Sequence, residues 1–203
     1  MKTQIYLVRH GQTDWNRDKK IQGWSDIPLN QSGIDEAEQL ALSMRTLSIH
    51  AVYSSPLLRA YRTAEIISRH HGLPITPLDS LKEAGFGRFE GFTWEQLMVH
   101  PLVVNRSQVI DRYHDHTGEG ESIHDVYLRT SAAIDSLVSK HRQEAILIVS
   151  HALAIKTIAY HAGVIEKNQI EHVEIKNAQL YHLAYNHSTD DFEIADFPIV
   201  RRS

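Results

Sequence analysis

The sequence predicts an α/β fold built around a mostly parallel central sheet, and three observations support this prediction. Short apolar runs alternate along the chain with segments whose apolar residues recur at steps of three and four. The runs at residues 5–8 and 145–149 are continuously apolar, as parallel strands buried on both faces usually are. The 203 residues include 42% hydrophobic and 23% charged side chains, which is the composition of an ordinary globular domain.

The first part of the chain predicts two strands, each followed by a helix. Residues 5–8 form the first strand, and the helix after it carries an apolar stripe over residues 34–47. Residues 51–53 form the second strand. Ser55-Pro56 then predicts a helix N-cap followed by proline in the first turn, and Gly72 is a typical stop signal for that helix.

Two capping boxes begin the helices of the second part. Thr93 with Gln96 opens a short helix, and Ser122 with Asp125 opens a longer one. Further along the chain we expect a strand at 145–149, a helix from Ala152 to Gly163, and late strands at 180–185 and 192–195.

Cationic or imidazole side chains follow each of the predicted parallel strands, at the sheet edge where α/β proteins bind their ligands. Arg9 and His10 follow the first strand, Arg59 comes shortly after the second, and His151 follows the strand at 145–149. A guanidinium group matches the geometry of phosphate or carboxylate, and Arg59 lies close to a helix N-terminus, which also favours anions. The sequence therefore predicts an anion-binding site, and phosphate is the expected ligand.

Composition excludes several ways of acting on that phosphate. Without cysteine, the chain has no thiol nucleophile, no thiolate zinc site and no disulfide. It contains neither a GxxxxGK[ST] loop nor an Asp-x-Asp pair, so histidine remains as the nucleophile. With 21 Lys and Arg against 25 Asp and Glu, the net charge of -4 argues against a nucleic-acid partner.

Targeting signals are not recognisable in the sequence. The apolar run at residues 5–8 is shorter than the core of a signal peptide, and no segment reaches the length of a membrane span. We therefore expect a cytoplasmic protein with no membrane partner. The oligomeric state cannot be inferred from these patterns.

Six segments, in this order, resemble the histidine phosphatase superfamily, also called phosphoglycerate mutase-like: LVRHGQTDWN, QGWSDIPLNQSG, SSPLLRAYRTAEI, LKEAGFGRFEG, GES and VSHA. RHG alone would be a weak signal, but the ordered set is specific. The resemblance implies one domain over residues 1–203, with three layers, helices on both faces of the sheet and a small lid around residues 85–120. It also implies a phosphatase that hydrolyses small phosphomonoesters through a phosphohistidine, with no cofactor or metal.

The resemblance also implies roles for individual residues. His10 is the nucleophile, Arg9, Arg59 and His151 hold the phosphoryl oxygens, and Glu83 is the general acid. Further positions follow from it: Asn16 and Gln22 as secondary phosphate contacts, and Ser55 as a helix-capping or rim residue. Glu90 lies in the same segment as Glu83 and is a competing candidate for the acid.

Two residues depart from the patterns of the family. Ala152 stands where the family usually has glycine, and its added methyl group either narrows the pocket or is accommodated by a helical backbone. Ala84 stands where phosphoglycerate mutases of this kind typically have arginine, and the stretch 91–119 contains few basic residues. Ala84 and the scarcity of basic residues in 91–119 both favour a phosphatase over a mutase, and the mutase remains the first alternative.

Other interpretations stay open at this point. A non-catalytic module that binds a phosphorylated ligand or a protein is the third hypothesis, and each arginine or histidine taken singly could be structural. A set of apolar residues suggests an apolar substrate portion, with local packing as the alternative: Phe86, Phe89, Phe92, Trp94, Val103 and Val104. His114 and His116 could bind a metal, although two such residues without a third partner usually belong to a loop.

Overall fold

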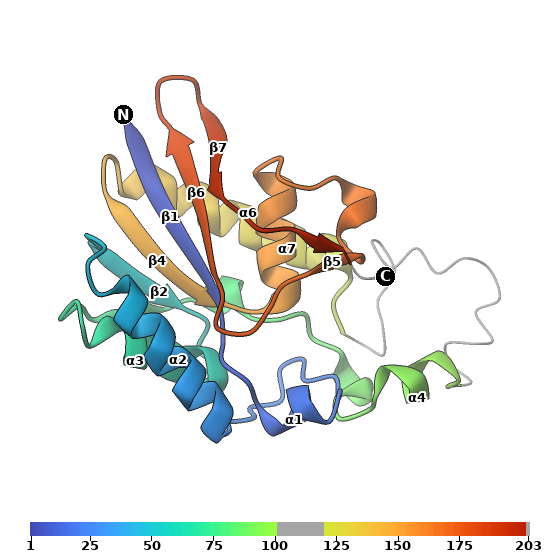
Figure 1. Cartoon of the computed structure of the whole chain (residues 1–203). Helices are drawn as coiled ribbons and strands as arrows, with labels where there is room; N and C mark the ends of the chain where they lie inside the picture. Colours follow the sequence, from blue (N-terminus) through green and yellow to red (C-terminus); the bar gives the residue numbers. More distant parts are fainter. Residues whose placement is uncertain (101–119, 202–203) are drawn as a thin grey trace.

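A computed structural model describes residues 1–100 and 120–201, and a six-stranded sheet forms its centre (Figure 1). The strand order is β3-β2-β4-β1-β6-β7. The strands are β1 (Lys2–Arg9), β2 (Ala51–Ser54), β3 (Ile75–Pro77), β4 (Ala145–Ser150), β6 (Leu180–Asn186) and β7 (Asp191–Asp196). β1 to β4 are parallel, whereas β6 and β7 are antiparallel to their neighbours. The predicted, mostly parallel sheet is therefore confirmed.

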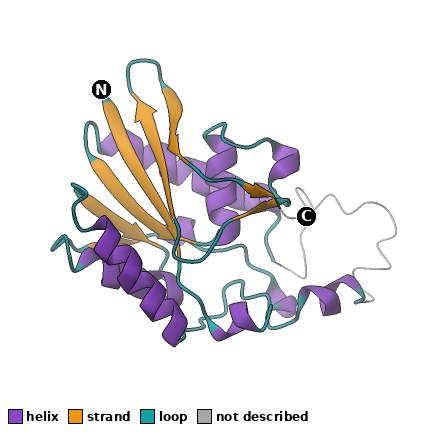
Figure 2. Ribbon diagram, in the orientation of Figure 1, coloured by secondary structure: helices purple, strands orange, loops and turns teal. Residues whose placement is uncertain are grey.

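Helices cover both faces of this sheet (Figures 1 and 2). α2 (Gln31–Met44) and α3 (Leu58–Ser68) pack on one face through small residues such as Ala37 and Ala60. α6 (Ile123–Lys140) and α7 (Ala152–His161) cover the other through larger residues such as Ile134 and Ile158. The three-layer architecture expected from the sequence is confirmed.

Shorter elements complete the described chain. They are α1 (Asp14–Arg17), η1 (Asp79–Leu81), η2 (Gly87–Phe89), α4 (Trp94–Met98), η3 (Lys167–Gln169) and the two-stranded pair β5 (Val173–Glu174) and β8 (Val200–Arg201). Figure 1 shows α1 and α4 beyond the carboxyl end of β1. No helix in the described part of the chain combines the length and the apolar character needed to cross a membrane.

β4 is the structural centre of the sheet because it lies between β2 and β1 and every one of its residues is buried. Its side chains alternate between the two cores. Ile146 and Ile148 pack on the α6–α7 side, and Leu147 and Val149 pack on the α2–α3 side. Each such buried side chain contributes about 1.5–3 kcal/mol relative to an exposed one. The edge of the sheet that carries the polar residues is therefore held in place by a well-packed interior.

The local signals of the sequence agree with the structure in most places. Both capping boxes form, at Thr93 for α4 and at Ser122 for α6. α7 ends at His161, two residues before the predicted Gly163. The short strand β3 escaped prediction because its three residues include only one large apolar side chain and end in proline.

The predicted N-cap at Ser55 is wrong. α3 begins at Leu58, and its first amide N–H is satisfied by a distant side chain, because Asp26 Oδ1 accepts from Leu58 N at 2.6 Å. The Ser55 hydroxyl instead accepts from Leu57 N at 3.3 Å and lies 2.8 Å from His151 Nε2. A local residue pattern cannot reveal a cap that arrives from another loop.

A close backbone approach fixes the loop after β1. A side chain on Gly11 would lie 2.3 Å from the carbonyl oxygen of Gly33 in α2, and one on Gly33 would lie 2.1 Å from Gln12 O. Real Cβ atoms essentially never come within 3.0 Å of backbone. Glycine at both positions therefore lets α2 pack directly against the segment that follows His10.

Four of the residues discussed above lie outside the described residues: Val103, Val104, His114 and His116. Most of the expected lid at 85–120 lies outside them as well. Its described beginning packs partly on itself and partly against the loop after β1, since the buried side chain of Phe89 shares a hydrophobic cluster with Leu97 and Ile21. At Phe89, local packing accounts for the aromatic residue.

Candidate active site at the carboxyl edge of the sheet

The register of β1 against β4 brings His10 and His151 together. Arg9 pairs with Ser150 at the end of the two strands, and His10 N donates to Ser150 O at 3.0 Å. The two imidazole rings that follow have centroids 5.1 Å apart. Both side chains are buried, with 2% and 0% of their surface exposed.

His10 is held as a neutral imidazole with a defined tautomer. Its Nδ1 lies 2.7 Å from Gly11 O. Because a carbonyl oxygen only accepts, Nδ1 carries the proton and Nε2 carries the free lone pair. Burial, followed by the charges of Arg59 and Arg9, holds the pKa of His10 well below its usual range. A neutral ring with a free Nε2 is the form that can act as a nucleophile.

Arg59 supplies a buried positive charge beside these rings. Its Nη1 donates to Ser25 O at 2.9 Å and its Nη2 to Gly23 O at 2.7 Å, so two of its five N–H groups hold the 23–25 loop. Burial lowers the pKa of Arg59 to about 10, and the group stays charged at neutral pH. No carboxylate of the described residues forms an ion pair with it.

Beside the His10 ring, Nε of Arg59 and Nδ1 of His151 are buried and have no hydrogen-bond partner among the described residues. An unsatisfied buried donor costs about 1–3 kcal/mol, and most buried polar groups in proteins are paired. An anion that accepts from these atoms would remove that cost. Burial and neighbouring positive charge also hold the pKa of His151 well below its usual range.

Arg9 joins the same group from the end of β1. Its Nη1 donates to Ile175 O at 2.6 Å, which fixes its guanidinium against the segment before β6. Its charge acts on His10, Arg59 and His151 alike, lowering the pKa of each. The structure thus brings together the four residues that the strand ends predict.

Asn16 and Gln22 meet at the hydroxyl of Thr13. The Thr13 Oγ1 atom lies 3.1 Å from Asn16 Oδ1 and 3.0 Å from Gln22 Oε1. The oxygen of each amide faces Thr13, so the other end of each amide is an NH2 group that can donate to an anion. Asn16 also closes the capping box of α1.

Asn177 is a residue of this region that the sequence did not reveal. Its Nδ2 donates to His10 O at 2.8 Å, and it lies 3.5 Å from Asn16 Oδ1. It comes from the loop before β6, more than 160 positions from His10 in the chain. No motif marks it, and only the pairing of β6 with β1 brings it here.

Glu83 and Glu90 have different surroundings. Oε1 of Glu83 accepts from Leu153 N at 3.1 Å, at the N-terminus of α7, and the Glu83 charge is the largest electrostatic influence on Arg59. Glu90 instead accepts from backbone, at 2.8 Å from both Trp24 N and Ser25 N. Glu83 therefore faces the buried cations, while Glu90 holds the loop that binds Arg59.

The site therefore combines a neutral imidazole, an anion cradle and one carboxylate at the carboxyl edge of a parallel sheet. Such an arrangement defines a class of protein that can bind a phosphoryl group and pass it to a histidine. Among the described residues, no group of three or more His, Asp or Glu side chains could hold a metal ion.

Comparison with known proteins agrees with this class. The family model of the histidine phosphatase superfamily (branch 1) matches residues 5–195, and the chain belongs to that superfamily. It is 36% identical over 152 residues to the probable phosphoglycerate mutase GpmB of Escherichia coli, which covers 75% of this chain and 71% of that protein. Relatives thus include a protein named as a mutase.

Solved structures give the same fold. YhfR of Bacillus stearothermophilus superposes with a TM-score of 0.85 at 28% identity over 96% of both chains. A phosphoserine phosphatase mutant from Entamoeba histolytica, solved in complex with phosphoserine, superposes with a TM-score of 0.80 at 25% identity over 96% of both chains. Ala152, where the family usually has glycine, begins α7 as an ordinary helical residue.

The two buried histidines predict a loss of stability in acid. Their native pKa values lie below the unfolded value of about 6.5, so the unfolded chain binds protons that the native state does not. As pH falls below about 6.5, each histidine lowers the free energy of unfolding by up to about 1.4 kcal/mol per pH unit. Urea unfolding across this range is expected to show a shallower pH slope for the His10→Gln, His151→Gln variant.

Exposed His70 provides the control, and His70→Gln is expected to keep the wild-type slope. A double variant with an unchanged slope would contradict the burial of two neutral imidazoles.

Proposed function

We propose that the protein is a phosphatase that hydrolyses small phosphomonoesters through a phosphohistidine formed at His10. One observation carries the proposal: the neutral, buried imidazole of His10 lies close to His151 and to the charge of Arg59, each of which has a buried polar atom without a hydrogen-bond partner. A nucleophile next to a group of buried anion-binding donors is the arrangement that phosphoryl transfer requires.

In the first step, His10 Nε2 attacks phosphorus. The P–N bond forms while the bond from phosphorus to the ester oxygen breaks, and the carboxyl group of Glu83 gives its proton to the leaving oxygen. Arg9, Arg59 and His151 bind the three equatorial oxygens, on which negative charge gathers, with Asn16 and Gln22 as secondary donors. General acid catalysis of this kind typically contributes about 10²–10⁴-fold.

In the second step, water attacks the phosphohistidine. The Glu83 carboxylate takes a proton from this water, the P–N bond breaks, and phosphate leaves with His10 neutral again. Two guanidinium groups supply the positive charge that a metal ion supplies in other phosphatases, so the proposed reaction needs no metal. The low pKa of His10 keeps the attacking atom unprotonated at neutral pH.

A phosphoglycerate mutase remains the second candidate, since a relative bears that name. A mutase must also bind the second acidic group of its substrate. Ala84, directly after Glu83, is 2% exposed and packs against Val126 and Ala154. That position therefore offers no basic side chain next to the proposed acid, which supports hydrolysis over isomerisation.

Phosphate release from a panel of monoesters tests the function. The panel contains an aryl phosphate, a ribazole-type nucleoside phosphate, sugar phosphates, phosphoserine and 3-phosphoglycerate, each with and without a chelator. We expect release that resists the chelator and is lost in His10→Ala. Formation of 2-phosphoglycerate without net release, with a bisphosphoglycerate primer present, would favour the mutase. Release that persists in His10→Ala would refute the nucleophile.

Glu83→Gln separates the acid from the nucleophile. kcat/KM reports the steps up to transfer onto His10, and only a poor leaving group needs a proton there. We expect kcat/KM to fall by about 10²–10⁴-fold on an alkyl phosphate and little on p-nitrophenyl phosphate. An equal fall on both substrates would show that Glu83 is not the acid.

A further inference from the structure

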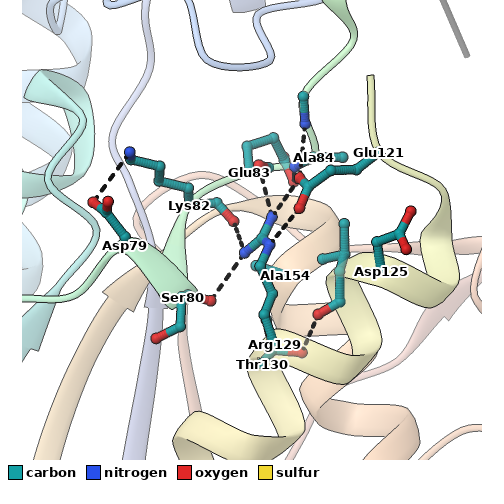
Figure 3. A network of polar contacts seen from close by, with 12 residues as sticks. Asp79, Ser80, Lys82, Glu83, Ala84, Glu121, Asp125, Arg129, Thr130 and Ala154 are labelled. Carbon is teal, nitrogen blue, oxygen red and sulfur yellow. Dashed lines mark hydrogen bonds and ion pairs between the residues drawn. The ribbon is translucent and has the colours of Figure 1, made fainter. Parts of the chain in front are cut away.

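The guanidinium group of Arg129, in α6, donates hydrogen bonds to the backbone of Glu83 and of the residues just before it (Figure 3). Its Nη1 donates to Ser80 O at 2.9 Å and to Lys82 O at 2.7 Å, and its Nη2 donates to Glu83 O at 2.9 Å. One guanidinium group therefore contacts three carbonyls within four residues. A planar fork can satisfy several acceptors in one plane, which a lysine ammonium cannot do.

Glu121 completes this contact from the segment that precedes α6. Its two carboxylate oxygens accept from Arg129 Nε at 2.8 Å and from Nη2 at 2.9 Å. All five N–H groups of the Arg129 guanidinium are thus used. Both side chains are about four-fifths buried, so this bidentate ion pair is shielded from water.

Glu121 also holds the other side of Glu83. Gly85 N donates to Glu121 Oε2 at 3.0 Å, and Glu121 N donates to Gly85 O at 2.8 Å. The neighbouring Gly120 packs so closely that a side chain there would lie 2.0 Å from Gly85 O. The backbone is therefore fixed at residues 80, 82 and 83 by Arg129 and at residue 85 by Glu121.

Neither residue donates or accepts a hydrogen bond at the proposed reaction centre, and Arg129 acts there only through its charge, which contributes to the lowered pKa of His151. The ends of Arg129 and Glu121 are occupied by backbone and by each other, whereas the carboxylate of Glu83 accepts from Leu153 N of α7 and from Ala84 N. Trp24 Nε1 adds a further bond to Glu83 O at 2.8 Å. The position of the Glu83 carboxylate is therefore set by the hydrogen bonds that fix the Glu83 backbone. Its carboxylate has no side-chain hydrogen-bond partner among the described residues.

We propose that the Arg129–Glu121 pair is a positioning device that sets the Glu83 carboxyl group at the distance and angle needed for proton transfer to the leaving oxygen. This inference rests on the proposed acid role of Glu83. Misplacing a catalytic group by about 1 Å can cost about 10²-fold in rate. The cost falls on the step that needs the proton, not on binding of the phosphoryl group.

The test compares Arg129→Gln and Glu121→Gln with Glu83→Gln on two substrates, an alkyl phosphate and p-nitrophenyl phosphate. Arg129→Gln is expected to lower kcat/KM by about 10²-fold on the alkyl phosphate and only a few-fold on p-nitrophenyl phosphate. Glu121→Gln, which keeps an amide oxygen, is expected to show the same split to a smaller extent. A structural defect would lower both rates together.

A double-mutant cycle adds a second readout. In the Glu83→Gln background, Arg129→Gln is expected to change the alkyl phosphate rate little, since the group it positions is gone. Asp135→Asn is the matched control, because Asp135 lies on α6 like Arg129 but its carboxylate contacts His161 of α7 instead of the backbone around Glu83. It is expected to leave both rates as in the wild type.

The outcomes separate this inference from the proposed function. If Glu83→Gln shows the leaving-group split but Arg129→Gln and Glu121→Gln lower both rates equally, the positioning role is overturned while the acid role stands. Full additivity of Arg129→Gln and Glu83→Gln overturns it as well. If Glu83→Gln itself shows no split, the acid role fails and the positioning role fails with it.

Discussion

The pairing of β1 with β4 is the constraint on which the rest of the site depends. Parallel strands in register end at the same edge, so Arg9 and Ser150 lie opposite each other and the next residue on each strand is a histidine. The His10 N to Ser150 O bond at 3.0 Å extends this ladder one step beyond the strands. β4 itself is buried along its whole length, which makes the edge rigid.

That rigidity holds an arrangement that is electrostatically unfavourable. Two neutral imidazoles and the guanidinium of Arg59 share a buried space, and no described carboxylate forms an ion pair with Arg59, although the charges of Glu83, Asp26 and Glu90 favour its charged form. Burying an unpaired charge is costly, and proteins keep such groups mainly where they are functional. Burial, together with the neighbouring positive charges of Arg59 and Arg9, holds the pKa values of His10 and His151 below their usual range.

Much of the site could be predicted because its residues lie directly beside strong local signals. His10 and His151 follow runs of apolar residues that only a buried strand explains, and Arg59 lies in the first turn of a helix. Contacts between distant segments could not be predicted in this way. Asp26 as the cap of α3, Asn177 on His10 O and Arg129 beneath Glu83 all depend on tertiary packing.

The choice between the two glutamates shows the same limit. Glu83 and Glu90 lie seven positions apart in one segment, and nothing in their neighbouring residues tells a proton donor from a loop anchor. Their hydrogen bonds do distinguish them. The carboxylate of Glu90 accepts hydrogen bonds from backbone N–H groups of the loop that binds Arg59. The carboxylate of Glu83 instead accepts from the N-terminus of α7 and acts on Arg59 through its charge.

Trapping the covalent intermediate tests the central claim, that His10 carries the phosphoryl group. In Glu83→Gln, an aryl phosphate can still transfer its phosphoryl group, but hydrolysis lacks its base, so the intermediate should accumulate. After mixing with p-nitrophenyl phosphate and quenching in alkali, which preserves phosphohistidine, peptide mass spectrometry should place one phosphoryl group on His10, together with a burst of nitrophenol. A phosphoryl group on another residue, or turnover with no phosphorylated enzyme, would contradict the account.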